Sequence, residues 1–132
     1  MARSEVDSAQ LHQIGAVAKA VGLSLRTIRY YEEVDIVPPS GRTGGGFRLY
    51  TDEDIERLRL VKQMKPLDFT LEEMRDLLET LDAAGEEVDG ADAGHERLAT
   101  YAAAADARCE RLREQLAAAE GIADRLRRQA AA

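Results

Sequence analysis

A short stretch of the chain concentrates residues that bind nucleic acids well, namely Arg26, Thr27, Arg29 and Tyr30. An arginine side chain reads a guanine or grips a phosphate through two parallel hydrogen bonds, and a tyrosine hydroxyl bonds to phosphate oxygens. These residue types favour binding over catalysis. The sequence contains neither a recognisable nucleophile with its base nor a glycine loop that opens onto a phosphate-binding lysine, so we expect no enzymatic activity.

Two short helices are predicted to position this stretch. Before Gly22, apolar residues recur at helical spacing at Ile14, Val17, Ala18 and Val21. Ser24 is well placed to cap a second helix, whose inward side would carry Leu25, Ile28 and Tyr31. A pair of helices joined by a turn around glycine is typical of a helix-turn-helix, in which the second helix enters the major groove of DNA.

A hairpin is predicted to follow, because Pro38 and Pro39 end the helical path. In "SGRTGGGFRLY" the run Gly44–Gly46 permits a tight turn, and Phe47 and Leu49 then alternate with Arg48 and Tyr50 as in a strand. Arg42 and Arg48 would lie on this wing, near a nucleic-acid backbone.

Two further helices are predicted behind the wing. Thr51 with Asp54, and Thr70 with Glu73, have the spacing of capping boxes, so we interpret these acids as structural. The first apolar stripe is Ile55, Leu58, Val61 and Met64, ending near Pro66, and the second is Leu71, Met74, Leu77, Leu78 and Leu81.

The last third of the chain has a different pattern. Residues 82–94 lack an apolar face and are interpreted as a linker, and residues 95–129 carry apolar residues at alternating steps of four and three, which predicts a coiled-coil helix. A rod of this length needs a partner helix, most simply its own copy. The expected dimerisation contacts are Leu98, Ala105, Cys109, Leu112, Leu116, Ala119 and Leu126.

Composition limits the remaining possibilities. The formal net charge is −7, but residues 1–70 are balanced and the acidity lies in the second half. A single cysteine and two histidines cannot build a four-ligand zinc site in one chain, so we expect no metal and no cofactor. Cys109 could be a thiol sensor, but a small apolar residue in the helix seam is the favoured interpretation. Without a membrane span or a secretory signal, the expected location is the cytoplasm, in association with the nucleoid.

Three segments together resemble the MerR family of bacterial transcription regulators, and the resemblance covers roughly residues 11–81. They are "IGAVAKAVGLSLRTIRYYEE", "VPPSGRTGGGFRLYTDEDIERL" and "FTLEEMRDLL". The sequence departs from the family pattern at Asp35 and Asp68, which stand where glycine is usual just past helix ends, and at Pro66. Aspartate is one of the few residues that tolerate a left-handed conformation at such ends.

The resemblance implies a mainly α protein. An N-terminal winged helix-turn-helix DNA-binding domain, residues 11–81, would be followed by a long dimerisation helix that forms an antiparallel coiled coil. It also implies a homodimer on a palindromic promoter, which bends and untwists the DNA and so acts on RNA polymerase indirectly. By family position Arg26, Thr27 and Arg29 would enter the groove. The backbone contacts would be Tyr30, Arg42, Arg48 and Tyr50, with Lys19 as a further phosphate contact.

Two questions stay open from the sequence. An alternative function is an architectural DNA-bending protein, or an interaction module built on the acidic coil, without promoter control of its own. An effector is not identified: either none is needed, or a small pocket forms between the linker, the coil and the DNA-binding domain of the second subunit. The target genes and the sign of regulation are equally undetermined.

Overall fold

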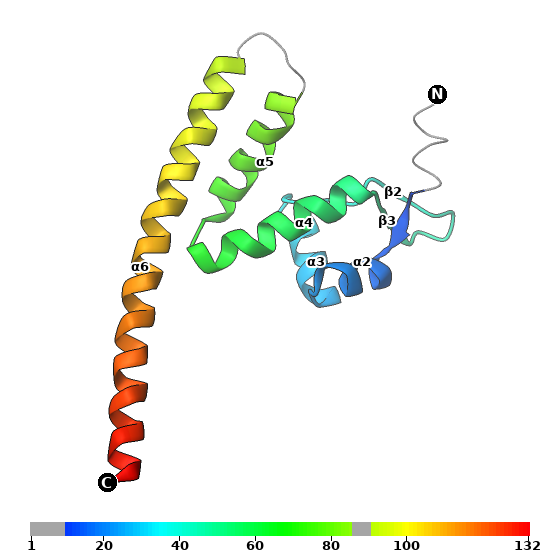
Figure 1. Ribbon diagram of the computed structural model, residues 1–132. Helices are drawn as coiled ribbons and strands as arrows, with labels where there is room; N and C mark the ends of the chain where they lie inside the picture. The colour runs from blue at the N-terminus through cyan, green and yellow to red at the C-terminus, as the bar shows by residue number, and fades with distance from the viewer. Residues whose placement is uncertain (1–9, 86–90) are drawn as a thin grey trace. The chain divides into compact units, whose positions relative to one another are not determined.

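The computed structural model describes residues 10–85 and 91–132 and divides into two compact units (Figure 1). The first unit extends to Glu79 and the second begins at Thr80, so the division falls inside one helix. The predicted winged helix-turn-helix and the predicted long C-terminal helix are both confirmed.

Helices α2 (Ile14–Val21) and α3 (Leu25–Glu33) form the helix-turn-helix. Gly22 ends α2 in a left-handed conformation with φ of 70°, as the glycine turn predicted. A Cβ atom at this position would lie 2.8 Å from the Nζ of Lys62, which itself donates a 2.8 Å hydrogen bond to the carbonyl of Val21. The turn therefore requires glycine for its left-handed conformation, and a larger residue would in addition displace the flexible end of Lys62.

The start of α3 is fixed by Ser24, whose Oγ accepts a 3.1 Å hydrogen bond from the amide of Thr27. Ile28 and Tyr31 are buried as predicted, with exposed fractions of 0% and 3%. Leu25 was also expected to face inward, and this prediction is wrong, because 39% of it is exposed. It is the first helical residue, and the side chains of a helix lean toward its N-terminus, beyond the packed face.

The end of α3 depends on a side chain from α5 (Leu71–Gly85). The guanidinium of Arg75 donates hydrogen bonds to the carbonyls of Val34, at 2.6 Å, and Asp35, at 3.3 Å. The last carbonyls of a helix lack partners inside the helix, and Arg75 supplies donors to the backbone at this end. Asp35 has a φ of 58°, which confirms the left-handed conformation predicted for it.

A three-stranded antiparallel sheet forms the wing, in the order β1-β3-β2. Strands β2 (Gly41–Arg42) and β3 (Arg48–Tyr50) are the predicted hairpin, with Arg42 opposite Arg48. Strand β1 (His12–Gln13) pairs with the other edge of β3 and was not predicted. Two residues are too few to show an alternating pattern, so the sequence carried no signal for this strand.

The tip of the wing and its base are both held by hydrogen bonds. At the tip, Gly46 has a φ of 87° and its amide donates to the carbonyl of Thr43 at 2.9 Å, as expected from the glycine run. At the base, Ser40 donates a 2.5 Å hydrogen bond to the carboxylate of Asp54. That buried carboxylate also accepts the amide of Thr51 at 3.0 Å, which attaches the wing to the start of the next helix.

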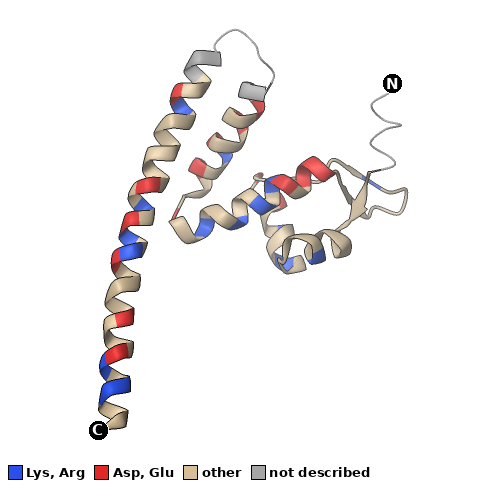
Figure 2. Cartoon of the chain, in the orientation of Figure 1, with Lys and Arg blue, Asp and Glu red and all other residues tan. Residues whose placement is uncertain are grey.

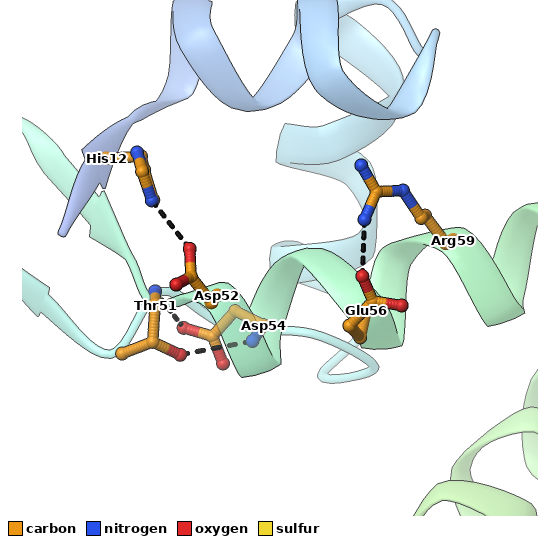
Figure 3. Close-up of polar contacts among 6 residues, drawn as sticks. All are labelled: His12, Thr51, Asp52, Asp54, Glu56 and Arg59. Carbon is orange, nitrogen blue, oxygen red and sulfur yellow. Dashed lines mark hydrogen bonds and ion pairs between the residues drawn. The ribbon is translucent and has the colours of Figure 1, made fainter. Parts of the chain in front are cut away.

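Helix α4 (Asp52–Met64) begins with the predicted capping box between Thr51 and Asp54, shown in Figure 3. Its neighbour Asp52 contacts the ring of His12 at 2.7 Å, so the first turn of α4 is also joined to β1. The predicted apolar stripe is confirmed, since all its members are buried: Ile55, Leu58, Val61 and Met64.

A short 3₁₀ helix, η1 (Lys65–Leu67), connects α4 to α5 at the predicted break around Pro66. Asp68 ends it in a left-handed conformation with φ of 60°, as predicted. The second capping box is present between Thr70 and Glu73. On α5, Met74 and Leu78 are buried, whereas Leu81, also expected on the apolar face, is 40% exposed.

The second unit contains α6 (Ala91–Ala131), a continuous helix that is longer than the expected 95–129. Because α5 runs to Gly85, the two helices occupy most of the segment 82–94 interpreted as a linker, and its residues 86–90 lie outside the described part. Alanine favours helix even without a periodic face, which the linker interpretation underestimated. No described helix is both long enough and apolar enough to span a membrane.

The left-handed residue just past the end of α3, Asp35, leads to a stability prediction. Replacing Asp35 with glycine removes the steric cost of a positive φ, whereas alanine keeps that cost and lacks the polar group. We expect Asp35→Gly to be more stable than Asp35→Ala by about 1 to 2 kcal/mol. Urea denaturation followed by circular dichroism measures the difference. Equal stabilities would contradict the left-handed conformation.

Candidate nucleic-acid interface

The outward side of α3 presents the predicted binding residues together. Arg26, Arg29 and Tyr30 are exposed, and Tyr30 retains 43% of its surface. Within residues 10–85 and 91–132, neither arginine has a carboxylate partner. Unpaired guanidinium groups on a rigid helix are free to bind an external anion or a base edge.

Thr27 is also one of the predicted binding residues on α3, but it forms hydrogen bonds with Ser24. Its hydroxyl accepts a 2.9 Å hydrogen bond from the hydroxyl of Ser24, and its backbone amide bonds to the same Ser24 oxygen. The Thr27 side chain is half-buried, so its orientation is set by the cap of the helix. Any contact it makes is thereby linked to the position of the helix start.

A depression of about 640 Å³ lies over this side of α3, and it includes a residue that sequence reasoning missed. Lys65, at the start of η1, lines it together with Arg26, Arg29 and Tyr30. Lys65 is exposed and has no anionic partner in the described residues. It lies far from α3 in the sequence, and no local pattern predicted that the end of α4 would bring a cation there.

The wing arginines are arranged differently, because both contact one carboxylate. The Nη2 of Arg42 donates a 2.5 Å hydrogen bond to Glu32, and the Nε of Arg48 donates to the other oxygen of the same group. The hydrogen bond to Glu32 is the main cause that raises the pKa of Arg48 above its ordinary value. Glu32 thus joins α3 to both strands of the hairpin.

The structure corrects the prediction for Tyr50. Its side chain is completely buried, with an exposed fraction of 0%, so in this conformation it presents no surface to a DNA backbone. Burial raises its pKa, and burial likewise raises the pKa of Tyr31, so both rings stay neutral at physiological pH. Alternation along β3 cannot by itself show which side faces the core, and Tyr50 packs inward.

Two other exposed residues complete the surface. Lys19 is exposed in the last turn of α2, as its predicted role as a phosphate contact requires. Phe47, at the tip of the wing, is 65% exposed, and the sequence treated it only as part of a strand. An apolar ring in this position is able to lie against sugars or bases in a groove.

Most of the acids of α4 gather in its first turn. Figure 2 shows Lys and Arg on α2 and α3 and a run of acids at the beginning of α4. Those acids are Asp52, Glu53 and Asp54, and they belong to the helix cap. Among the described residues, no group of three or more His, Cys, Asp or Glu side chains has an arrangement that could hold a metal ion.

Comparison with known proteins agrees with this geometry. The model for the MerR HTH family regulatory proteins matches residues 13–81, which is more than half of the chain. The chain belongs to the MerR family. The match includes α2, α3, the β2-β3 hairpin, α4 and most of α5, so the whole candidate interface is part of the MerR domain.

Relatives in the MerR family are similar over the same part of the chain. The chain is 40% identical over 77 residues to an HTH-type transcriptional regulator, a ZntR homolog from Haemophilus influenzae, covering 58% of this chain and 57% of the relative. The chain therefore spans little more than half the length of that curated relative.

Solved MerR structures share the fold. A MerR family transcriptional regulator from Listeria monocytogenes is 26% identical, with a TM-score of 0.67, over 86% of this chain and 83% of its own. HiNmlR, a MerR family regulator lacking the sensor domain and solved bound to promoter DNA, has a TM-score of 0.61 at 23% identity, over 92% and 88% of the two chains.

The shared carboxylate leads to a prediction about the wing. Glu32→Gln weakens both charge-assisted hydrogen bonds, and we expect about 1 kcal/mol of lost stability with faster amide hydrogen exchange between residues 41 and 50. The neighbouring Glu33→Gln is the matched control, since Glu33 is exposed and forms no hydrogen bond or ion pair in the described residues, and its charge acts on Arg48 only as the weakest of several influences. Identical exchange rates in the two variants would show that Glu32 does not hold the wing.

Proposed function

We propose that this protein is a DNA-binding transcription regulator. It binds a palindromic promoter as a homodimer and controls transcription by bending and untwisting the DNA. The observation that carries the proposal is the exposed face of α3, on which Arg26 and Arg29 lie without carboxylate partners in the described residues. Membership of a family of HTH regulatory proteins supports the same conclusion.

The contacts divide into two kinds. Arg26, Arg29 and Thr27 are placed on the helix that enters the major groove, where arginine distinguishes guanine by hydrogen bonds to two acceptors. Tyr30 and Lys65 line the same depression as these residues, and Lys19 is exposed on α2. All three are suited to phosphate contacts, which fix the position of the protein without reading the sequence. Tyr50 is not included among the contacts, because it is buried.

The wing arginines contribute a positive surface that is already partly neutralised. Arg42 retains 45% of its side-chain surface while bonded to Glu32, and Arg48 retains 29%. Each guanidinium has further N–H donors that Glu32 does not occupy. In the proposed complex these donors face phosphates, and Glu32 keeps the two side chains at a fixed distance from α3.

Distortion of the DNA follows from this arrangement when two copies bind together. A bend of 40 to 90° over a site of 20 to 30 base pairs costs about 1 to 6 kcal/mol, and extra phosphate contacts must offset that cost. Each subunit supplies contacts from α3 and from a wing held rigidly beside it. Such a protein positions the promoter for RNA polymerase without touching the polymerase itself.

The alternative is an architectural DNA-bending protein without promoter control. The same surface would serve it, since DNA bending alone needs the same phosphate contacts. A promoter with a 19 to 20 base-pair spacer separates the two functions. If the protein binds and bends this promoter but transcription does not change, the result favours the architectural alternative.

The two kinds of contact lead to different mutant phenotypes. Arg29→Ala should weaken binding to the operator by about 1 to 3 kcal/mol and leave non-specific binding nearly unchanged, whereas Lys65→Ala should weaken all duplexes alike and reduce the salt slope by about 0.9. Fluorescence anisotropy at several salt concentrations measures both effects. Tyr50→Phe is the control and should bind like the unaltered protein. Full affinity in both alanine variants would refute the proposed interface.

The target itself is accessible to selection. Binding of the purified protein to a genomic DNA pool, followed by sequencing, should enrich duplexes with a twofold sequence, because a symmetric dimer requires a symmetric site. We expect the centre of that symmetry to fall between the −35 and −10 elements of a promoter. Enrichment of bent or A·T-rich DNA without a dyad would support the architectural alternative instead.

A further inference from the structure

The sizes and charges of the side chains along α6 indicate how a second copy of the helix would pair with it. Large apolar side chains on this helix remain exposed, with exposed fractions between 42% and 62%: Leu112, Leu116, Ile122 and Leu126. Leu112, Leu116 and Leu126 belong to the predicted seam, and Ile122 lies beside it. We propose that a second copy covers these side chains in one defined antiparallel register, with Cys109 opposite Leu112 of the partner subunit. This inference rests on the homodimer of the proposed function.

Side-chain size is the first argument for this register. In an antiparallel pair of heptad helices, the two kinds of seam position face each other, and layers pack well when a large residue meets a small one. The proposed register places Leu112 against Cys109, Leu116 against Ala105 and Leu98 against Ala123. Two further layers join Ala102 with Ala119 and, toward the ends of the helix pair, Leu126 with His95. No layer sets two leucines against each other.

The second argument for this register is the charge of the residues that lie beside the seam on one side of the helix. Figure 2 shows acidic and basic residues interleaved along α6. In the proposed register Asp106 lies next to Arg113 of the partner subunit, and twofold symmetry repeats the contact. Residues that flank the seam set the orientation and partner choice of coiled coils through such pairs. Within the described residues Asp106 has no partner, and Arg113 bonds only to Glu110 on its own helix, where both side chains are well exposed.

The opposite flank supplies an apolar contact. There the same register brings Ile122 beside Tyr101 of the partner subunit. Ile122 is 62% exposed and lies outside the predicted seam, so a simple heptad assignment leaves it without explanation. Contact with an aromatic ring of the second copy covers it and adds buried apolar area next to the Leu98 layer.

Registers shifted by one heptad lose these features. Moving Cys109 opposite Ala119 of the partner subunit sets Asp106 against Glu120 and Arg113 against its own copy. Moving it opposite Ala105 of the partner subunit sets Asp106 against its own copy. Like charges at these positions are destabilising, so only the proposed register matches charge on this flank.

Charge reversal tests the register directly. Asp106→Arg places two guanidinium groups together at both contacts, and Arg113→Asp places two carboxylates together. We expect each variant to weaken the homodimer at least about tenfold, and an equimolar mixture of the two to form a heterodimer close to the original affinity. Sedimentation equilibrium measures the dissociation constants, and native mass spectrometry identifies the heterodimer. Both sites are exposed, so the helix content should not change.

Matched controls lie on the outer side of the same helix. Glu114→Arg and Arg111→Asp make the same charge changes away from the seam and should leave dimerisation unchanged. If Asp106→Arg instead tightens the dimer, Asp106 faces Glu120 or another acid and the proposed register is refuted while the homodimer stands. If the unaltered protein sediments as a monomer at micromolar concentration, both the register and the proposed homodimer fail.

Discussion

One carboxylate determines how the binding surface is assembled. Glu32 lies on the recognition helix, and its two oxygens accept hydrogen bonds from Arg42 and Arg48 on the two strands of the wing. A helix and a hairpin that meet through few apolar contacts need such a polar joint to keep a fixed distance. The charge of Glu32 is small beside the cations around it, yet it decides where those cations point. Glu32 therefore holds the wing and α3 together as one surface.

This joint explains why the arginines of the protein are not equivalent. Those on α3 form no ion pair among the described residues, whereas those on the wing are oriented by the carboxylate of Glu32. Ordering a long side chain on binding costs conformational entropy, and a preformed pair avoids part of that cost. The surface thus combines adaptable contacts at its centre with preoriented contacts at its edge.

Much of this architecture was predictable from local sequence signals. The glycine turn, the serine cap, the two capping boxes and the apolar stripe of α4 are decided by neighbouring residues, and all were confirmed. The aspartates at positive φ were also foreseen. Three of the misses involve long-range packing: the inward position of Tyr50, the strand at His12, and Lys65 beside α3. None of these follows from a local period, because each depends on which element packs against which.

The hydrogen bonds from Arg75 to the backbone after α3 connect two helices that are far apart in the sequence. The backbone carbonyls just past α3 are held by a side chain of α5, the helix whose later residues enter the second unit. The C-terminal end of α3 is thereby bonded to α5, the helix that continues into the second unit. The guanidinium therefore fixes the end of α3 to α5 within the first unit, so the position of α3 depends on a helix that is distant from it in the sequence.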